Sequence, residues 1–208
     1  MGWWERHGVP RMVEASLGTE QVHELRAETC RPLDGRVLEV GFGSGLNVDH
    51  YPAAVTEVAA VEPNETAWRL AAPRLARSAV PVLRSGLDGQ RLDEPDDSFD
   101  HVLLTFVLCT VPDQVGALSE ARRVLRSGGV VHFLEHGLAP DAPVQRWQRR
   151  LEPVQKRIGG GCHLTRDPVA DLGSAALEVE QLTTFYAPGP AVSRPWAHVY
   201  QGTARKIG

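Results

Sequence analysis

The fold is decided by the stretch Arg36-Val37-Leu38-Glu39-Val40-Gly41-Phe42-Gly43-Ser44-Gly45-Leu46-Asn47. Its first part, rich in valine and leucine, predicts a buried strand. Three glycines at alternate positions follow, and they let the backbone turn sharply and approach a ligand closely because no Cβ intervenes. We expect a helix over 46–51 that ends at Pro52. A strand, a glycine loop and a helix N-terminus in this order open a nucleotide-type cofactor site.

The spacing of the glycines distinguishes this loop from a dinucleotide site. Dinucleotide loops read G-x-G-x-x-G and cradle a pyrophosphate. Here Gly41, Gly43 and Gly45 read G-x-G-x-G, with Leu46 where the third dinucleotide glycine would stand. Glu39 precedes the loop, and an acid suits a ligand with an ammonium or sulfonium group better than a phosphate. Turns and tight packing also use glycine, so the loop alone is weak evidence.

A second acid stands where ribose recognition needs one. We expect the next apolar strand over 57–61, and Glu62 follows it, 21 residues after Gly41. At a spacing of about 20 residues a carboxylate can accept hydrogen bonds from ribose hydroxyls. With both acids in register, the segment resembles the S-adenosyl-L-methionine site of class I methyltransferases, and we expect that cofactor.

The third strand and the turn after it supply a candidate adenine contact. We expect a helix over 64–79, kinked or split by Pro73, and then a short strand over 80–83. An acid just past a third strand can accept a hydrogen bond from an adenine amino group, and the next backbone N–H can reach a ring nitrogen. Asp88 and Gly89 fit these roles. Alternatively, Asp88 only favours a turn before Gly89.

The most apolar run, 99–111, predicts a fourth strand that is buried on both faces, as parallel strands are. Thr105 and Phe106 fall near its carboxyl end, where open α/β sheets bind ligands. We expect a helix over 113–125 and a fifth strand over 130–135. Strands and helices that alternate in this way predict a doubly wound parallel sheet.

These segments together predict one cofactor site at the carboxyl edge of the sheet. The residues expected to bind the cofactor come from the glycine loop and from the strand ends that follow it: Glu39, Gly41, Gly43, Gly45, Asn47, Glu62, Pro63, Asp88, Gly89, Thr105 and Phe106.

The length predicts a single domain over 1–208, with ample chain for a sizeable core. An N-terminal helical segment, 1–35, is interrupted near Gly18 and either lids the site or covers a sheet edge. The cofactor-binding half, 36–136, follows. An insertion on the substrate side, 137–166, breaks the rhythm of strands and helices, and such insertions commonly build the substrate pocket.

The remaining elements complete the expected fold. The insertion holds a helix over 144–158, and the C-terminal part, 167–208, begins with a helix over 167–176. Strands over 177–185 and 197–205 predict a closing hairpin whose last strand is antiparallel. The fold class is therefore α/β and Rossmann-like, a seven-stranded, mostly parallel sheet with helices on both faces.

Composition limits the partners. The net charge of −4 and the pI near 6.1 give no electrostatic footprint for nucleic acid. The three cysteines (Cys30, Cys109 and Cys162) are odd in number and lack C-x-x-C pairing, so we expect no metal site. No apolar run approaches the roughly 20 residues that span a bilayer, and no signal peptide is evident. We expect a cytoplasmic protein without an integral membrane segment, and leave its oligomeric state open.

Several segments are similar to those of the membrane-associated alkyl-thiol methyltransferases, a methyltransferase-like family of animals. These segments are Thr105-Phe106-Val107-Leu108-Cys109-Thr110-Val111, Arg122-Arg123-Val124-Leu125-Arg126-Ser127-Gly128-Gly129, Glu135-His136, Arg146-Trp147-Gln148, Glu152-Pro153 and Gly161-Cys162-His163-Leu164-Thr165-Arg166. The resemblance runs from about 36 to 185, and its last segment is the most distinctive. It implies a seven-stranded sheet, S-adenosyl-L-methionine as methyl donor and a small thiol as acceptor.

The expected reaction is in-line displacement at a sulfonium methyl, in which positioning does much of the work. A thiol acceptor reacts as the thiolate, and a nearby histidine can take its proton. His136 and His163 are the candidate catalytic residues, and the alternative for each is a hydrogen-bonded structural histidine. Cys162 is expected to be structural, because methyl transfer needs no enzyme nucleophile.

Two other functions stay open. The cofactor half does not encode the acceptor, so the enzyme could instead methylate a nitrogen, oxygen or carbon atom of a lipid amine, quinone or phenol. The third reading is a non-catalytic regulatory protein that binds S-adenosyl-L-methionine in a closed pocket. In each enzymatic reading the partner is a small-molecule methyl acceptor.

Overall fold

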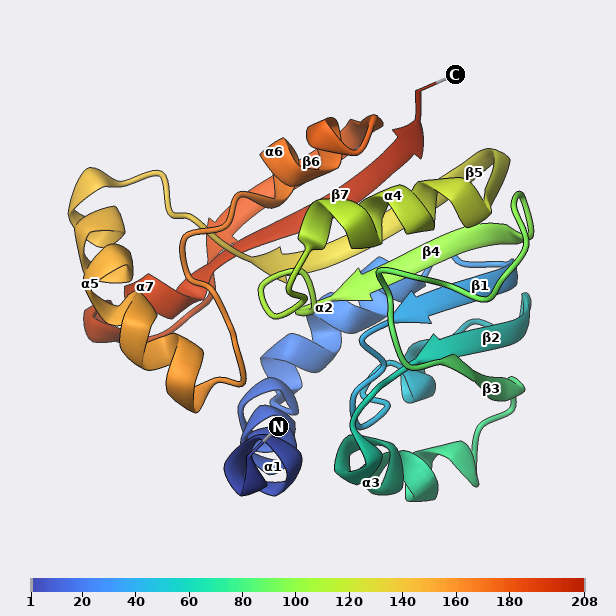
Figure 1. Cartoon of the computed structure of the whole chain (residues 1–208), viewed down its shortest axis with the longest axis horizontal. Coiled ribbons are helices and arrows are strands. Elements are labelled where there is room, and N and C mark those ends of the chain that lie inside the picture. Colours follow the sequence, from blue (N-terminus) through green and yellow to red (C-terminus); the bar gives the residue numbers. More distant parts are fainter. Residues whose placement is uncertain (1, 208) are drawn as a thin grey trace.

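The computed structural model describes residues 2–207. Within them lies a seven-stranded sheet in the order β3-β2-β1-β4-β5-β7-β6 (Figure 1). The strands β1 to β5 pair in parallel, and β7 is antiparallel to both β5 and β6. The predicted sheet and its antiparallel last strand are therefore confirmed. The strands are β1 Gly35–Val40, β2 Val55–Val61, β3 Val82–Gly86, β4 Phe99–Thr105, β5 Leu125–His136, β6 Leu177–Tyr186 and β7 His198–Lys206.

Helices cover both faces of the sheet (Figure 1). Apolar residues of α4 and α6 pack on one face, and residues of α2 and α3 pack on the other. The bounds are η1 Trp4–Gly8, α1 Val9–Leu17, α2 Glu20–Cys30, η2 Val48–His50, α3 Glu65–Leu75, α4 Gln114–Val124, α5 Ala142–Ile158, α6 Pro168–Ser174, η3 Ala191–Ser193 and α7 Arg194–Ala197, of which η1 is a π-helical turn and η2 and η3 are 3₁₀ turns.

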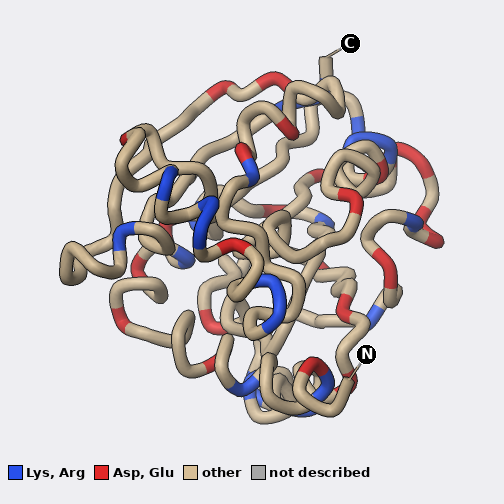
Figure 2. The backbone as a smooth tube through the Cα atoms, turned by 60° about the vertical axis from the view of Figure 1, so that its left-hand side comes forward, with Lys and Arg blue, Asp and Glu red and all other residues tan. Residues whose placement is uncertain are grey.

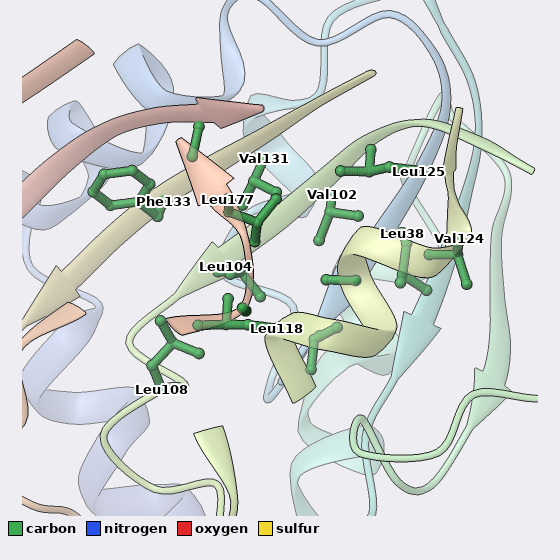
Figure 3. Close-up of a cluster of buried hydrophobic side chains, with 14 of the residues drawn as sticks. Leu38, Val102, Leu104, Leu108, Leu118, Val124, Leu125, Val131, Phe133 and Leu177 are labelled. Atoms are coloured by element: carbon green, nitrogen blue, oxygen red, sulfur yellow. The ribbon is translucent and has the colours of Figure 1, made fainter. Parts of the chain in front are cut away.

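Alternate residues of β1 face opposite layers, because successive side chains of a strand point to opposite sides. Leu38 packs with Leu118 of α4 in the larger buried cluster, which Figure 3 shows between the sheet and that helix. Val37 faces the other layer, where Cys30 of α2 covers it. Glu39 lies two residues after Val37, so its carboxylate points toward the α2 side. An acid is thereby placed inside the protein, below the glycine loop.

The predicted strand over 99–111 is wrong in its second half. β4 ends at Thr105, and Phe106 takes a left-handed conformation with φ of 54°. The next residues close into a turn in which the N–H of Thr110 donates to the carbonyl of Val107 at 2.9 Å. The composition stays apolar because this turn is itself buried. An apolar run alone does not distinguish a buried strand from other buried backbone.

The predicted helix over 46–51 is reduced to a single 3₁₀ turn, Val48–His50. Its bonds run from the N–H of Val48 to the carbonyl of Gly45 at 3.1 Å, and from that of His50 to Asn47 at 2.9 Å. Gly45 and Pro52 leave too few residues between them for an α-helix to propagate beyond its unfavourable nucleus.

Other boundaries shift by a few residues. The helix predicted over 64–79 is α3, which begins after Asn64 because the side chain of that residue accepts the first N–H groups, and ends at Leu75. Pro73 lies within its last turn, so the helix is not split there, and the bond lost to proline falls near the helix end. The strand predicted over 80–83 is β3, which starts at Val82.

The N-terminal helical segment is interrupted at Gly18, as predicted, and it connects distant parts of the chain. The indole N–H of Trp4 donates to the carbonyl of Ile158, at the end of α5, at 3.0 Å. The hydroxyl of Ser44, in the glycine loop, donates to the carboxylate of Glu14. The segment therefore lies across the sheet edge that carries the glycine loop.

Among residues 2–207, no helix is both long and apolar enough to cross a bilayer. The 17-residue helix α5, for example, carries Arg146, Arg149, Arg150, Lys156 and Arg157. Figure 2 shows acidic and basic residues interspersed along the backbone rather than separated into halves.

A buried carboxylate at the end of β5 fixes the turn after β4. Glu135 is fully buried, and its Oε1 accepts hydrogen bonds from the N–H groups of Val107 at 2.9 Å and Leu108 at 3.2 Å. The second oxygen has no partner among the described residues. Burial raises the pKa of Glu135 to about 7, although the two N–H bonds favour the charged form.

Replacing this acid, in Glu135→Gln, should remove a pH dependence of the free energy of unfolding. The pKa of Glu135 rises from 4.5 to about 7 on folding. The stability that follows from this shift is fully present below pH 4.5 and is lost as the pH rises from 4.5 through 7. Urea unfolding should show wild-type stability falling by about 1–3 kcal/mol relative to the variant across that window. A difference independent of pH would contradict the raised pKa. Glutamine retains an acceptor for Val107 and Leu108.

Candidate active site

The candidate site lies at the carboxyl ends of β1 and β4, where the strand order reverses. From β1 the chain moves outward to β3 and then returns to β4, on the other side of β1. In open α/β sheets such a reversal creates the crevice that takes the ligand. The loop after β1 and the turn after β4 touch here, since a Cβ at Gly41 would lie 2.3 Å from Cγ2 of Val107.

The three glycines of the loop all have left-handed backbones, with φ of 75° at Gly41, 59° at Gly43 and 75° at Gly45. A Cβ at Gly45 would come within 3.2 Å of three neighbouring side chains, so packing requires glycine there. Gly43 differs, because a Cβ there would meet only the carbonyl oxygen of Gly41, at 3.8 Å. Gly43 therefore borders open space from which a ligand can approach the backbone.

The N–H groups of this loop are largely used within the protein. Gly41 and Phe42 both donate to one carbonyl of β2, at 3.0 and 3.1 Å, and Gly45 donates to the carbonyl of Phe42 at 3.0 Å. The N–H of Gly43 donates to the carboxylate of Glu62 at 2.7 Å. A phosphate cradle needs several N–H groups that converge on the anion. This loop instead presents a carboxylate, which disfavours a pyrophosphate and favours a ligand with hydroxyls or positive charge.

Glu62 closes the loop from β2. Its Oε2 accepts from Gly43, and its Oε1 accepts from the N–H of Asn64 at 2.6 Å. Burial raises the pKa of Glu62, while those two N–H groups oppose the shift. A carboxylate offers about four acceptor positions, so two remain. The predicted ribose acid is thus built into the loop and still able to accept two hydroxyls.

Glu39 lies below the loop rather than on its open side. It is 1% exposed, and its carboxylate accepts hydrogen bonds from Nδ2 of Asn47, at 3.0 Å, and from the hydroxyl of Tyr51. Asn47 also donates to Thr105 at 2.9 Å, and Nη1 of Arg26 donates to Asn47 and Thr105 at 2.8 and 2.9 Å. The positive charge near Glu39 therefore comes from the protein itself. Burial raises the pKa of Glu39 to about 7.

The residues after Glu62 border a hollow. Pro63 is exposed at the start of α3, where the side chain of Asn64 accepts the N–H groups of Thr66 and Ala67. A cavity of about 290 Å³ lies between this helix start and the N-terminal segment, and it is lined by Arg6, His7, Pro63, Asn64, Glu65, Thr66 and Arg69.

Asp88 and Gly89 form a turn at the same edge. Oδ1 of Asp88, which is exposed, accepts from both the backbone N–H and the side-chain amide of Gln90, each at 2.9 Å. This is the turn expected as the alternative for Asp88. A Cβ at Gly89 would lie 2.6 Å from Cγ1 of Val40, the last residue of β1. The turn therefore passes directly over the strand that leads into the glycine loop.

Thr105 and Phe106 stand at the end of β4, as predicted. Thr105 is buried in the network below the loop, and the guanidinium of Arg26 lies 5.4 Å from the centre of the Phe106 ring. The N–H of Phe106 donates to the carbonyl of Leu134 at 2.8 Å. A positive φ at a residue other than glycine is uncommon and costs energy, and such residues cluster at functional turns.

The two candidate histidines have different surroundings. Nε2 of His136 lies 3.3 Å from Sγ of Cys162. Burial opposes its charged form, but Cys162 and nearby carboxylates outweigh burial and raise the pKa of His136. Nδ1 of His163 lies 2.9 Å from Oε1 of Glu152, and the His163 side chain is 26% exposed. His136 is thus enclosed beside a thiol, and His163 is an accessible ring oriented by an acid.

Sequence reasoning missed three residues that hold this region together. Arg26 enters the network below the loop from α2, and Glu135 holds the turn after β4. Glu14 contacts the loop through Ser44 and also pairs with Arg74 of α3 at 2.7 Å. Arg26 and Glu14 lie in helices of mixed polarity, and the sequence of such a helix predicts that its charged side chains face solvent. Of the three, only Glu135 could be recognised from the sequence. An acid at the end of an apolar strand is costly to bury, so its presence there indicates a specific partner.

Comparison with known families identifies part of the chain. Residues 38–133 match the family model described as a methyltransferase domain. This range begins in β1 and ends in β5, so it contains the glycine loop, Glu62, the Asp88 turn and the turn after β4.

Two curated relatives extend beyond that range. The chain is 36% identical over 152 residues to thiol S-methyltransferase TMT1B of Rattus norvegicus, covering 70% of this chain and 61% of that protein. It is 32% identical over 127 residues to phosphatidylethanolamine N-methyltransferase of Cereibacter sphaeroides, covering 60% and 62%. The chain thus spans less than two thirds of the length of these relatives.

Solved structures show the same architecture. An S-adenosylmethionine-dependent methyltransferase of Thermotoga maritima superposes with a TM-score of 0.67 at 22% identity, covering 98% of both chains. The likeness at this identity concerns the fold alone. Together, the family match and the shared architecture show that residues 38–133 carry a methyltransferase domain and that the chain has the class I methyltransferase fold.

Proposed function

We propose that this protein transfers a methyl group from S-adenosyl-L-methionine to the sulfur of a small thiol. The observation that carries the proposal is the closed glycine loop, in which the N–H of Gly43 is bound by Glu62 and the remaining bonds are internal. Such a loop suits a ribose diol and a cationic sulfonium, and it is poorly suited to a pyrophosphate.

In this proposal the cofactor supplies a methyl group made electrophilic by the positive sulfur to which it is attached. Glu62 accepts the ribose hydroxyls with its two unused acceptor positions, and the open side of Gly43 leaves room for the ligand. Pro63 offers an apolar surface to the adenine. Asp88 accepts from the adenine amino group, and the N–H of Gly89 donates to a ring nitrogen.

Glu39 acts from below in the same proposal. Its carboxylate lies among Asn47, Tyr51 and Thr105, and its pKa near 7 leaves it partly protonated at neutral pH. A cation bound above the loop favours the ionised form by direct attraction. The network thereby matches its charge to a cationic ligand, with Phe106 forming the neighbouring wall.

The thiol acceptor is supported by the rat relative and by the surroundings of His163. A thiol reacts as its thiolate, so a base beside the acceptor accelerates the reaction when the pKa of the thiol is above the working pH. Glu152 binds Nδ1 of His163 and leaves Nε2 available to take the proton. His136 is the second candidate, and its Nε2 already contacts Cys162.

A second acceptor class has its own support. The relative from Cereibacter sphaeroides is a phosphatidylethanolamine N-methyltransferase, so a nitrogen atom of a lipid amine is the alternative acceptor. Oxygen and carbon atoms of quinones and phenols are the other possible methyl acceptors, because the cofactor-binding half does not determine the acceptor. The acceptor panel below distinguishes these from a thiol.

The Glu62→Ala variant should bind S-adenosyl-L-methionine, or its demethylated product, about 1–3 kcal/mol more weakly, the cost of losing charge-assisted hydrogen bonds. Isothermal titration calorimetry measures this directly. Glu57→Gln is a matched control, since Glu57 lies on β2, the strand that Glu62 follows, and pairs with Arg36 away from the loop. Unchanged affinity in Glu62→Ala would remove Glu62 from the ribose role, and tight binding of NADH would overturn the cofactor assignment.

Replacing Asp88 by asparagine should weaken cofactor binding while leaving the melting temperature unchanged. Asparagine retains an oxygen that can accept the N–H of Gln90, so the turn is preserved while the negative charge facing the adenine amino group is lost. Calorimetry with S-adenosyl-L-methionine tests this, with Asp93→Asn as a control in the same connection. If Asp88→Asn binds the cofactor as tightly as Asp93→Asn does, Asp88 stabilises the turn and does not contact the adenine.

The acceptor is tested by mass spectrometry of reactions with alkyl thiols, phenols and amines. We expect a methyl thioether from the thiols. Replacing His163 by alanine should slow the reaction by roughly 10²–10⁴-fold at neutral pH if His163 is the base. The loss should shrink for an acidic aryl thiol, which is already ionised.

The pattern of products separates the three functions. A methylated amine or phenol without any thioether would reject the thiol acceptor and leave the methyltransferase standing. Binding of the cofactor with no product from any acceptor would favour the regulatory reading. Equal rate losses for alkyl and aryl thiols would assign His163 a structural role.

A further inference from the structure

Two cysteines and a histidine that are distant in the sequence meet at the carboxyl edge of the sheet. Sγ of Cys109, Sγ of Cys162 and a ring nitrogen of His136 all lie within 4.8 Å of one another. Cys109 belongs to the turn after β4, His136 ends β5, and Cys162 follows α5 in the insertion. The spacing in the sequence predicts no metal site, but the fold brings three metal-ligating side chains together.

The backbone around this cluster is built to bring Cys162 inward. After α5 the chain reverses through Gly160 and Gly161, whose φ angles of 62° and 92° suit glycine. The N–H of His163 then donates to the carbonyl of Cys109 at 2.8 Å. This bond holds the two cysteine-bearing segments side by side, so their proximity does not depend on the thiols alone.

The two thiols are buried, the histidine is half-buried, and the cluster is incompletely paired. Cys109 is 4% exposed and Cys162 is 8% exposed. The Nε2 atom of His136 contacts Cys162 at 3.3 Å, while its Nδ1 is buried with no hydrogen-bond partner among the described residues. Nε2 is therefore the ring nitrogen placed to join Cys162 in binding an ion.

The chemistry of these ligands selects a thiophilic metal. Two sulfurs and one imidazole nitrogen are ligands that Zn²⁺ binds in tetrahedral geometry. Zinc–sulfur and zinc–nitrogen bonds of about 2.3 and 2.0 Å place neighbouring ligand atoms about 3.5–3.8 Å apart. The observed cluster needs only small side-chain movements to reach that spacing. Two thiolates also balance the charge of the ion, which lowers the cost of burying it.

We propose that Cys109, Cys162 and His136 bind one Zn²⁺ ion and leave its fourth coordination position open. Three protein ligands and one exchangeable position are the pattern of catalytic rather than structural zinc sites. The ligands come from three different segments of the chain, so the ion also fixes the insertion to the end of the sheet.

The position of the cluster suggests what occupies the fourth site. Cys109 is two residues after Val107, which touches Gly41 of the cofactor loop. The proposed ion and the loop are therefore linked by one short turn, which Glu135 holds in place. The occupant we assign is the acceptor sulfur, and this assignment rests on the proposed function. On binding, the thiol passes its proton to the base of the proposed function, His163, and its sulfur lone pair forms the bond to zinc.

Cobalt substitution tests the metal site without any activity. Titrating Co²⁺ into the reduced, metal-free full chain should give one equivalent of tetrahedral cobalt–thiolate absorption, which Zn²⁺ then displaces. Cys109→Ser and Cys162→Ser should each weaken cobalt binding at least about 10-fold, since loss of a coordinating thiolate removes a principal ligand. Cys30→Ser is the matched control, because Cys30 is a buried free cysteine outside the cluster.

A second measurement uses the unmodified protein, so it does not depend on whether a variant folds. Zn²⁺ should protect Cys109 and Cys162 from alkylation, read by peptide mass spectrometry, while the labelling of Cys30 stays unchanged. No cobalt–thiolate absorption, or absorption that Cys109→Ser and Cys162→Ser leave intact, would overturn the site. Formation of a Cys109–Cys162 disulfide in reducing buffer, in place of metal binding, would overturn it equally.

The fourth position is tested by adding an alkyl thiol to the cobalt-loaded protein. A further thiolate ligand should intensify and shift the cobalt absorption, and a phenol or amine of similar size should not do so. An unchanged spectrum would make the site structural and reject the open position. If thioether product forms at the same rate after chelation of zinc, the metal inference fails and the proposed function stands. If cobalt binds but no thioether forms, the proposed function fails and the metal site stands.

Discussion

The carboxylate of Glu62 holds the glycine-loop end of this fold together. It accepts the N–H of Gly43 with one oxygen and that of Asn64 with the other, so it joins the glycine loop to the start of α3. The left-handed glycines follow from this arrangement, because the loop must turn back on itself to bring Gly43 over β2. The open space above Gly43 and the packing of the turn after β4 against Gly41 both depend on that closure.

Below the loop, the protein buries charge in order to hold neighbouring segments in register. Arg26, Asn47 and Thr105 form a hydrogen-bonded chain that joins α2, the loop and β4, and Glu39 completes it. Each of these groups is costly to remove from water unless it is paired, so an incorrect pairing of segments would leave a charge unpaired. The network therefore favours one arrangement of the loop over alternatives that hydrophobic packing alone would tolerate.

The sequence predicts those parts of the site in which the relevant residues are close along the chain or repeat with a strand period. The glycine loop, Glu62 and the turn at Asp88 are of this kind, because each follows directly from a strand end. Arg26 is not, since its neighbours on α2 are polar and only the folded sheet creates the buried partners it meets. The Cys109 cluster also escapes notice, because its three ligands belong to separate segments that the glycine turn after α5 brings together. The strand predicted over 99–111 is too long for a related reason. A turn that tertiary contacts bury has the same apolar composition as a buried strand.

The antiparallel strand β7 determines the order in which the sheet can be completed. β6 does not pair with β5 and joins the sheet only through β7, which lies between them. During synthesis, β5 therefore keeps an unpaired edge until 198–206 has emerged, and β6 has no partner strand until then. An apolar strand with an open edge is a template for pairing with another chain. Strand β7 thus protects the edge of β5, which is synthesised about 70 residues earlier. A chain shortened at its C-terminus would leave this edge open to aggregation, even though the glycine loop is already complete.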